Sequence, residues 1–259
     1  MATVVATVNT AQAKVDLDIT FAPTVTHITV GRRDPSGYTQ LIRYGDEVAL
    51  TAGAVRIDDH EAPLDVPVTY IATQALPVGS EFGESAEVVV PSNGVGWLKD
   101  PGYPSTNLRL DVITSIEELA RPSRAGVFNI LDRANPVVIT AKRQGVVGEL
   151  VCHTMTDADR KSMTAILSRG TVLLLQTPYA YGFGSAYVHI GDATETRVGL
   201  AMEPSRRWTL PFVETDRPEG LAVQPITDRT WGAVNQTHAS WAALAGTGKS
   251  FRELLEQGP

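Results

Sequence analysis

The feature that most constrains the fold is a strict alternation of apolar and polar residues near the start of the chain. Between residues 15 and 21 every odd position is apolar and every even position is polar. Successive side chains of a β-strand point to opposite faces, so this period of two predicts a strand with one buried face. About seven short runs of strand character, separated by turn residues, predict a β-sandwich over residues 1–92.

Two further segments of this region carry specific expectations. Asp34 to Gly37 has the residues preferred in a type I turn, and we expect it to join residues 25–32 to residues 38–43 as a hairpin. Asp58 to Gln74 resembles the part of fibronectin-type sandwiches in which a turn leads into a strand with a central tyrosine. Tyr70 is therefore the candidate core aromatic, and the alternative is a tyrosine in an exposed edge strand.

The middle of the chain changes in composition. Residues 93–107 are rich in glycine and proline but also contain Trp97 and Tyr103, which predicts an ordered linker. We expect Trp97 to pack between two domains, with stacking on a ligand as the alternative. Strands resume at Leu108, and residues 108–226 are predicted to form a second antiparallel β-domain.

One interior helix is predicted in this second domain, at residues 157–169. We expect Thr156 to cap it together with Asp159, and Gly170 to end it. Its apolar residues recur at helical spacing, which is typical of a helix packed on a sheet. Pro211 lies in the last long strand and predicts an edge or a bulge there. Residues 227–259 predict a short helical C-terminal extension.

Composition limits the classes of partner. The formal net charge is −7, and basic residues never occur in a run longer than two. This argues against nucleic acid as a bound partner, although an acidic surface suits DNA that passes without sticking. Cys152 is the only cysteine, and we expect it to be buried in a strand. We identify neither an export signal nor a membrane-spanning stretch, and expect no membrane insertion.

Candidate sites for chemistry are few. Ala243 to Ser250 resembles a phosphate-binding loop, but alanine stands at the first glycine position and the surrounding residues do not predict a parallel sheet. A glycine-rich hinge between two helices is the favoured interpretation. Asp58 to Glu61 is a dense cluster of possible ligands that either chelates a cation or forms a solvated acidic turn. The five histidines are scattered. We therefore assign no catalytic, cofactor-binding or metal-binding residue, and expect no cofactor and no enzyme.

A family resemblance rests on segments from both halves of the chain. These include residues 31–37, 58–70, 97–110, 135–152, 156–170 and 206–218. They resemble minor tail proteins of long-tailed bacteriophages of actinobacteria, in particular the distal tail protein. The resemblance implies a tail-tube-like β-domain with one packed helix, which would be residues 108–226, so the order of domains would be reversed relative to that family. It offers no site residues to carry over.

The resemblance also implies a function and partners. It points to a virion structural protein of the tail tip, made in the host cytoplasm, that forms a ring with copies of itself, commonly a hexamer. The ring joins the tail tube to the baseplate and contacts tube, tape measure and hub proteins, while genomic DNA passes through it without specific binding. Two alternatives stay open. One is a carbohydrate-binding or host-surface adhesion module that uses aromatics such as Trp97, Tyr179, Tyr181 and Phe183. The other is a nucleotide-binding enzyme.

Overall fold

The computed structural model describes residues 2–76, 81–131, 134–200 and 202–218, which form several antiparallel sheets and one α-helix. This confirms the predicted mainly β fold with a packed helix. The described residues all belong to one compact unit. The predicted C-terminal helices at residues 227–259 and the loop from Ala243 to Ser250 lie outside the described part of the chain.

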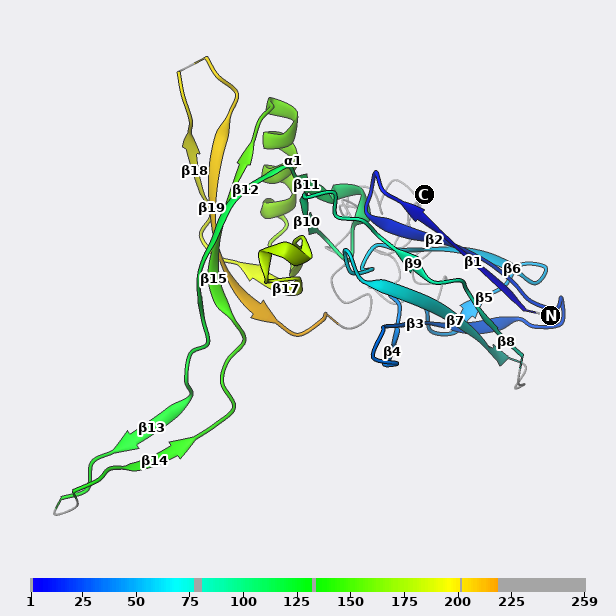
Figure 1. Cartoon of the computed structure of the whole chain (residues 1–259), viewed down its shortest axis with the longest axis horizontal. Coiled ribbons are helices and arrows are strands. Elements are labelled where there is room, and N and C mark those ends of the chain that lie inside the picture. Colours follow the sequence, from blue (N-terminus) through cyan, green and yellow to red (C-terminus); the bar gives the residue numbers. More distant parts are fainter. Residues whose placement is uncertain (1, 77–80, 132–133, 201, 219–259) are drawn as a thin grey trace, which may run out of the picture. The chain divides into compact units, whose positions relative to one another are not determined.

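The first ninety residues form two antiparallel sheets (Figure 1). The first sheet has the order β1-β2-β6, with strands β1 (Thr3–Asn9), β2 (Lys14–Thr20) and β6 (Ala54–Asp59). The second has the order β4-β3-β7-β8, with β5 added to β3 and β9 to β7. Its strands are β3 (His27–Arg33), β4 (Thr39–Leu41), β5 (Val48–Ala49), β7 (Pro67–Leu76), β8 (Phe82–Glu84) and β9 (Val88–Val89).

The sequence patterns of this region correspond to a first hydrophobic core. Val15, Leu17 and Ile19 of β2 are buried, as the alternation predicts, and Tyr70 of β7 is fully buried in the same core. The hairpin from β3 to β4 is also confirmed. In its turn, the Asp34 carboxylate accepts hydrogen bonds from backbone N–H groups of the following residues, and Gly37 adopts a φ of 86°.

The second half is built on an eight-stranded sheet with the order β11-β10-β16-β17-β19-β15-β12, and β18 pairs with β19. Its strands are β10 (Gly96–Lys99), β11 (Leu108–Leu110), β12 (Val112–Ala120), β15 (Val147–Thr154), β16 (Leu173–Gln176), β17 (Ser185–Ile190), β18 (Thr194–Arg197) and β19 (Arg206–Thr215). Two short 3-10 helices, η1 (Pro104–Thr106) and η2 (Tyr179–Tyr181), lie in the connections. A separate hairpin contains β13 (Ala125–Phe128) and β14 (Val137–Thr140).

Helix α1 (Asp157–Ser168) packs on this sheet as predicted. Thr156 Oγ1 accepts a hydrogen bond from the N–H of Asp159, the Asp159 carboxylate accepts one from the N–H of Thr156, and Gly170 follows the helix with a φ of 63°. Met163 and Ile166 are fully buried in a second hydrophobic core, which also contains Cys152. Within the described residues, no helix has the length and apolar character needed to cross a bilayer.

Of the two alternatives predicted at Pro211, an edge or a bulge, the edge is wrong. Strand β19 lies inside the sheet, between β15 on one side and β17 and β18 on the other. Pro211 is tolerated because it lies where β18 ends and β17 takes over, so that no neighbouring strand requires its missing N–H. Its carbonyl still accepts a hydrogen bond of 2.8 Å from the N–H of Gly191.

The two cores meet on a single strand. Trp97 of β10 belongs to the first core and Leu98, the next residue, belongs to the second. Strand β10 lies within residues 93–107, the predicted linker, and pairs with both β11 and β16. The assignment of residues 1–92 and 108–226 to separate domains stays a prediction.

The capping box gives a test of the helix. Replacing Thr156 by alanine removes the acceptor for the N–H of Asp159, and we expect the free energy of unfolding to fall by about 1 kcal/mol. Urea unfolding followed by circular dichroism measures the change. Ser162→Ala is the matched control, because its hydroxyl only donates to the carbonyl of Ala158 in the preceding turn, and a change within about 0.5 kcal/mol is expected. Equal losses in both variants would contradict the capping role.

Candidate functional site

The aromatic residues suggested for sugar binding do not form one exposed platform. Trp97 is buried in the first core, and Phe183 packs edge-on against Phe212 with ring centroids 5.5 Å apart. Tyr179 and Tyr181 of η2 are exposed. The described side chains therefore offer two open aromatic rings of the four that the sequence suggested.

The acidic cluster from Asp58 to Glu61 is not a solvated turn, because two of its carboxylates are buried. Asp59 and Glu61 are buried, and each is paired with arginine. Among the described residues, no group of three or more histidine, cysteine, aspartate or glutamate side chains could hold a metal ion. The sequence prediction missed this arrangement because the arginines that pair with these carboxylates are distant in sequence.

Asp59 is held inside the first core. Its carboxylate accepts hydrogen bonds from Arg32 Nη1 at 2.6 Å and from the Tyr70 hydroxyl at 2.9 Å. Burial alone would raise the pKa of Asp59, but the Arg32 guanidinium, the N–H of Glu61 and the Tyr70 hydroxyl together lower it below its ordinary value. Asp59 therefore stays ionised, and the predicted core tyrosine has a charged partner.

Glu61 connects the first half of the chain to the end of β19. One carboxylate oxygen accepts a hydrogen bond from Arg43 Nε at 2.6 Å, and the other accepts one from Arg217 Nη2 at 2.6 Å. Arg217 also donates to the Leu41 carbonyl at 2.8 Å, and Arg43 donates to the Pro218 carbonyl at 3.2 Å. These contacts fix the residues after β19 against the segment that follows β4.

Lys99 is the third ionisable group at this junction, and it is 1% exposed. Its ammonium donates to the carbonyls of Ala13 at 2.6 Å and His60 at 2.8 Å, and lies 5.6 Å from the centroid of the Trp97 ring. Burial lowers the pKa of Lys99 to about 7, although the nearby carboxylates of Asp59 and Glu61 partly oppose this effect. We call Asp59, Glu61, Lys99 and their arginine partners the charge junction.

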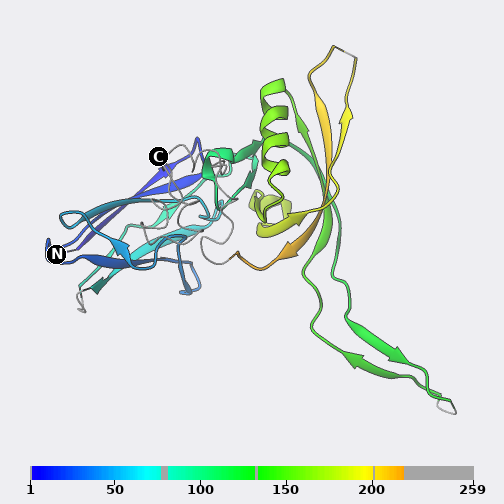
Figure 2. The ribbon, with the colours of Figure 1, turned by 180° about the vertical axis from the view of Figure 1, so that it is seen from behind.

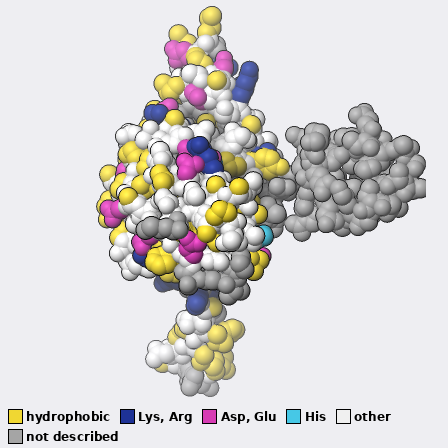
Figure 3. Space-filling view, turned by 90° about the vertical axis from the view of Figure 1, so that its right-hand side faces the viewer, with side chains coloured by type: hydrophobic (Ala, Val, Ile, Leu, Met, Phe, Trp, Pro, Cys, Tyr) yellow, Lys and Arg dark blue, Asp and Glu magenta, His cyan; other side chains and the backbone are white. Residues whose placement is uncertain are grey.

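An exposed apolar surface lies on the hairpin of β13 and β14. Residues 121–143, which we call the arm, continue from β12 and return to β15 (Figures 1 and 2). Six apolar side chains of the arm are between 47% and 91% exposed, namely Val127, Phe128, Ile130, Leu131, Val138 and Ile139. Apolar side chains also cover much of the arm in the space-filling view (Figure 3). Such a surface marks a contact site.

The arm also differs in charge from the rest of the protein. Residues 121–143 contain five basic residues and one acidic residue, a formal charge of +4. Because the whole chain carries −7, the other residues carry −11. The arm therefore combines apolar side chains with positive charge, whereas the remaining residues carry a net negative charge. The sequence predicts strands here. It does not reveal that Val127 and Phe128, which are neighbours in β13 and point to opposite faces of the hairpin, are both exposed.

Comparison with known proteins gives little further information. No protein-family model matches the sequence, and no curated protein matches it. Among solved structures, the chain is similar to the Dit protein (gp 19.1) of SPP1, which is described as a paradigm of the hub adsorption apparatus in phages that infect Gram-positive bacteria. The match covers 47% of this chain and 50% of that chain, at 17% identity and a TM-score of 0.33. These values are too low to transfer a fold or a function.

Glu61 provides a test of the charge junction. Glu61→Gln leaves Arg43 and Arg217 without their buried carboxylate, and we expect the free energy of unfolding to fall by about 3 kcal/mol or more. Urea unfolding measures the change. Glu84→Gln is the control, because its ion pair with Arg33 is exposed and should be worth at most about 1 kcal/mol. A loss at Glu61 no larger than that at Glu84 would contradict the role of the junction.

The lowered pKa of Lys99 predicts that the stability of the protein depends on pH. The pKa of Lys99 is lower in the folded protein than in the unfolded chain, so unfolding takes up a proton between the two values. The free energy of unfolding should therefore rise with pH, by roughly 1–2 kcal/mol between about pH 7.5 and about pH 9. Lys99→Met should lose this rise. Denaturant unfolding of both proteins at each pH measures it, and an equal slope in the two proteins would contradict the assignment.

Proposed function

We propose that this protein is a structural component of a bacteriophage tail tip that assembles with copies of itself into a ring between the tail tube and the baseplate. The observation that carries the proposal is the arm, whose apolar side chains are exposed in the single chain. The resemblance of the sequence to distal tail proteins supplies the biological setting. The proposed role is structural and requires no bond-making residues.

The exposed side chains of the arm favour self-association on energetic grounds. Fully burying one side chain such as Phe128 or Leu131 is worth about 1.5–3 kcal/mol, and these two are 53% and 91% exposed. The positive charge of the arm fits the negative charge that the rest of the chain carries. A second copy of the same chain therefore provides a surface of the required character.

The kind of contact also favours a ring. An arm that binds a different surface of its neighbour makes a heterologous contact, which closes into a ring or continues as a filament. Rings, commonly of six copies, are the form that the resemblance implies. The acidic remainder of the chain suits a channel through which DNA moves without being bound. Tail tube, tape measure and hub proteins are the partners proposed for the two sides of the ring.

Removing the arm tests the proposal. At the base of the arm, the N–H of Gln144 donates to the carbonyl of Pro122. The two residues that flank a two-residue hairpin turn are joined by the same kind of bond. Replacing residues 123–143 by Asn-Gly should therefore leave the sheet intact. We expect the intact protein to form rings by multi-angle light scattering and negative-stain electron microscopy, and the shortened protein to be monomeric with an unchanged circular dichroism spectrum.

The control for this experiment is Tyr179→Ser, which changes an exposed side chain outside the arm and should leave the rings unaffected. A strictly monomeric intact protein at high concentration, together with its absence from purified tail particles, would overturn the proposal. Rings that persist without the arm would show that another surface carries the self-association.

A further inference from the structure

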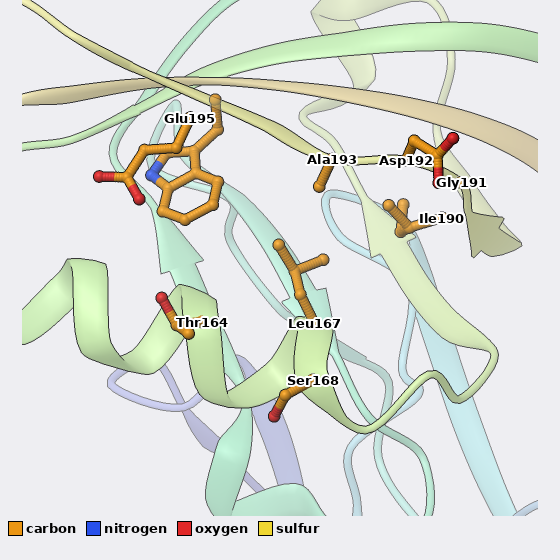
Figure 4. Close-up of a pocket in the computed structure, with 9 residues that line it drawn as sticks. Thr164, Leu167, Ser168, Ile190, Gly191, Asp192, Ala193 and Glu195 are labelled. Carbon is orange, nitrogen blue, oxygen red and sulfur yellow. The ribbon is translucent and has the colours of Figure 1, made fainter.

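An open pocket of about 550 Å³ lies between the C-terminal half of α1 and the connection from β17 to β18 (Figure 4). Its apolar lining comes from Leu167 of the helix, Ile190 of β17, Ala193 of the connection and Trp208 of β19. Asp192 and Glu195 lie among its polar residues. The volume is within the range of pockets that hold several side chains or a small ligand.

The pocket is formed in the single chain and is held by hydrogen bonds. Trp208 is buried, and its indole N–H donates to Thr154 Oγ1 at 3.0 Å. The connection is fixed on the other side by the bond from the N–H of Gly191 to the carbonyl of Pro211. A preformed pocket binds a partner without the cost of ordering its walls.

The two carboxylates at the pocket differ in their surroundings. Glu195 is neutralised by Arg160 Nε at 2.6 Å and Arg206 Nε at 2.9 Å. Asp192 is exposed, and no ion pair to it is found within the described part of the chain. An occupant that matches this pocket combines an apolar side chain with a positive charge close by.

We infer that the pocket receives the arm of a second copy of this chain, an inference that rests on the proposed function and specifies the contact. The arm carries exposed apolar side chains such as Phe128 and Leu131. On the arm, Arg124 and Lys142 lie near the paired strands β13 and β14. The positive charge of the arm therefore complements Asp192, and its apolar side chains suit the apolar lining around Trp208.

The arm cannot reach the pocket of its own chain. Val147, where the arm rejoins the sheet, pairs with Val213 of β19, and Trp208 lies five residues further from the arm. Phe128 lies eight residues beyond Ala120 in the opposite direction. At about 3.3 Å per residue, Trp208 and Phe128 are roughly 40 Å apart when measured along the paired strands and the arm. Both ribbon views show the arm leaving the end of β12 and β15 away from α1 (Figures 1 and 2). The contact is therefore between copies.

A pair of cysteines tests this contact. Asn129 on the arm and Ala193 at the pocket are both exposed, and each can be replaced by cysteine without removing an apolar contact of the arm. The natural Cys152 is buried, and burial raises its pKa to about 12, so it should not form disulfides in this experiment. Under mild oxidation, the variant with both cysteines should give a ladder of covalent oligomers on a non-reducing gel, whereas each single variant should give at most dimers.

The matched control pairs Asn129→Cys with Tyr179→Cys, an exposed position outside the pocket, and should give no ladder. Asp192→Arg should weaken self-association at least tenfold in light scattering. If rings form but neither the ladder nor the effect of Asp192→Arg is seen, the pocket assignment is overturned while the proposed function stands. If the intact protein forms no oligomer, the proposed function fails as well.

Discussion

The ladder between β15 and β19 is the interaction on which the rest of the second half depends. Eight consecutive pairs, from Val147 with Val213 to Thr154 with Arg206, hold these strands in register. The arm leaves one end of this ladder, and Trp208 places the pocket nearer the other end. One set of backbone hydrogen bonds thus fixes both surfaces that we assign to assembly, the arm at one end of the ladder and the pocket nearer the other.

The charge junction provides a different kind of connection. Burying Asp59, Glu61 and Lys99 is costly unless each has a partner, and each has at least two. The bonds of Asp59 to Arg32 and Tyr70 stay within the first half of the chain. Glu61 and Lys99 connect the two halves, because Glu61 pairs with Arg217 after β19 and Lys99 of β10 donates to the carbonyls of Ala13 and His60. The arm has no comparable contacts among the described residues, so its surface is available to a partner.

The sequence predicts the local structure well and the long-range contacts poorly. The alternation in β2, the turn from Asp34 and the cap at Thr156 all follow from nearest-neighbour chemistry, and the structure confirms them. For Tyr70 the sequence left a core and an edge position open, and the structure places it in the core. The edge strand predicted at Pro211 was wrong because the effect of a proline depends on which strands flank it. The burial and pairing of Glu61 were not predicted, because its partners Arg43 and Arg217 are 18 and 156 residues away and cannot be identified from the residues beside it. The pocket around Trp208 likewise joins a helix to a distant connection.

The adjacency of Trp97 and Leu98 has a mechanical consequence. The two cores share one hydrogen-bonded strand, so a single peptide bond separates side chains that anchor different halves of the protein. Among the described residues, a load between the halves that passes along the backbone therefore enters β10, whose hydrogen bonds to β11 and β16 hold it in the sheet.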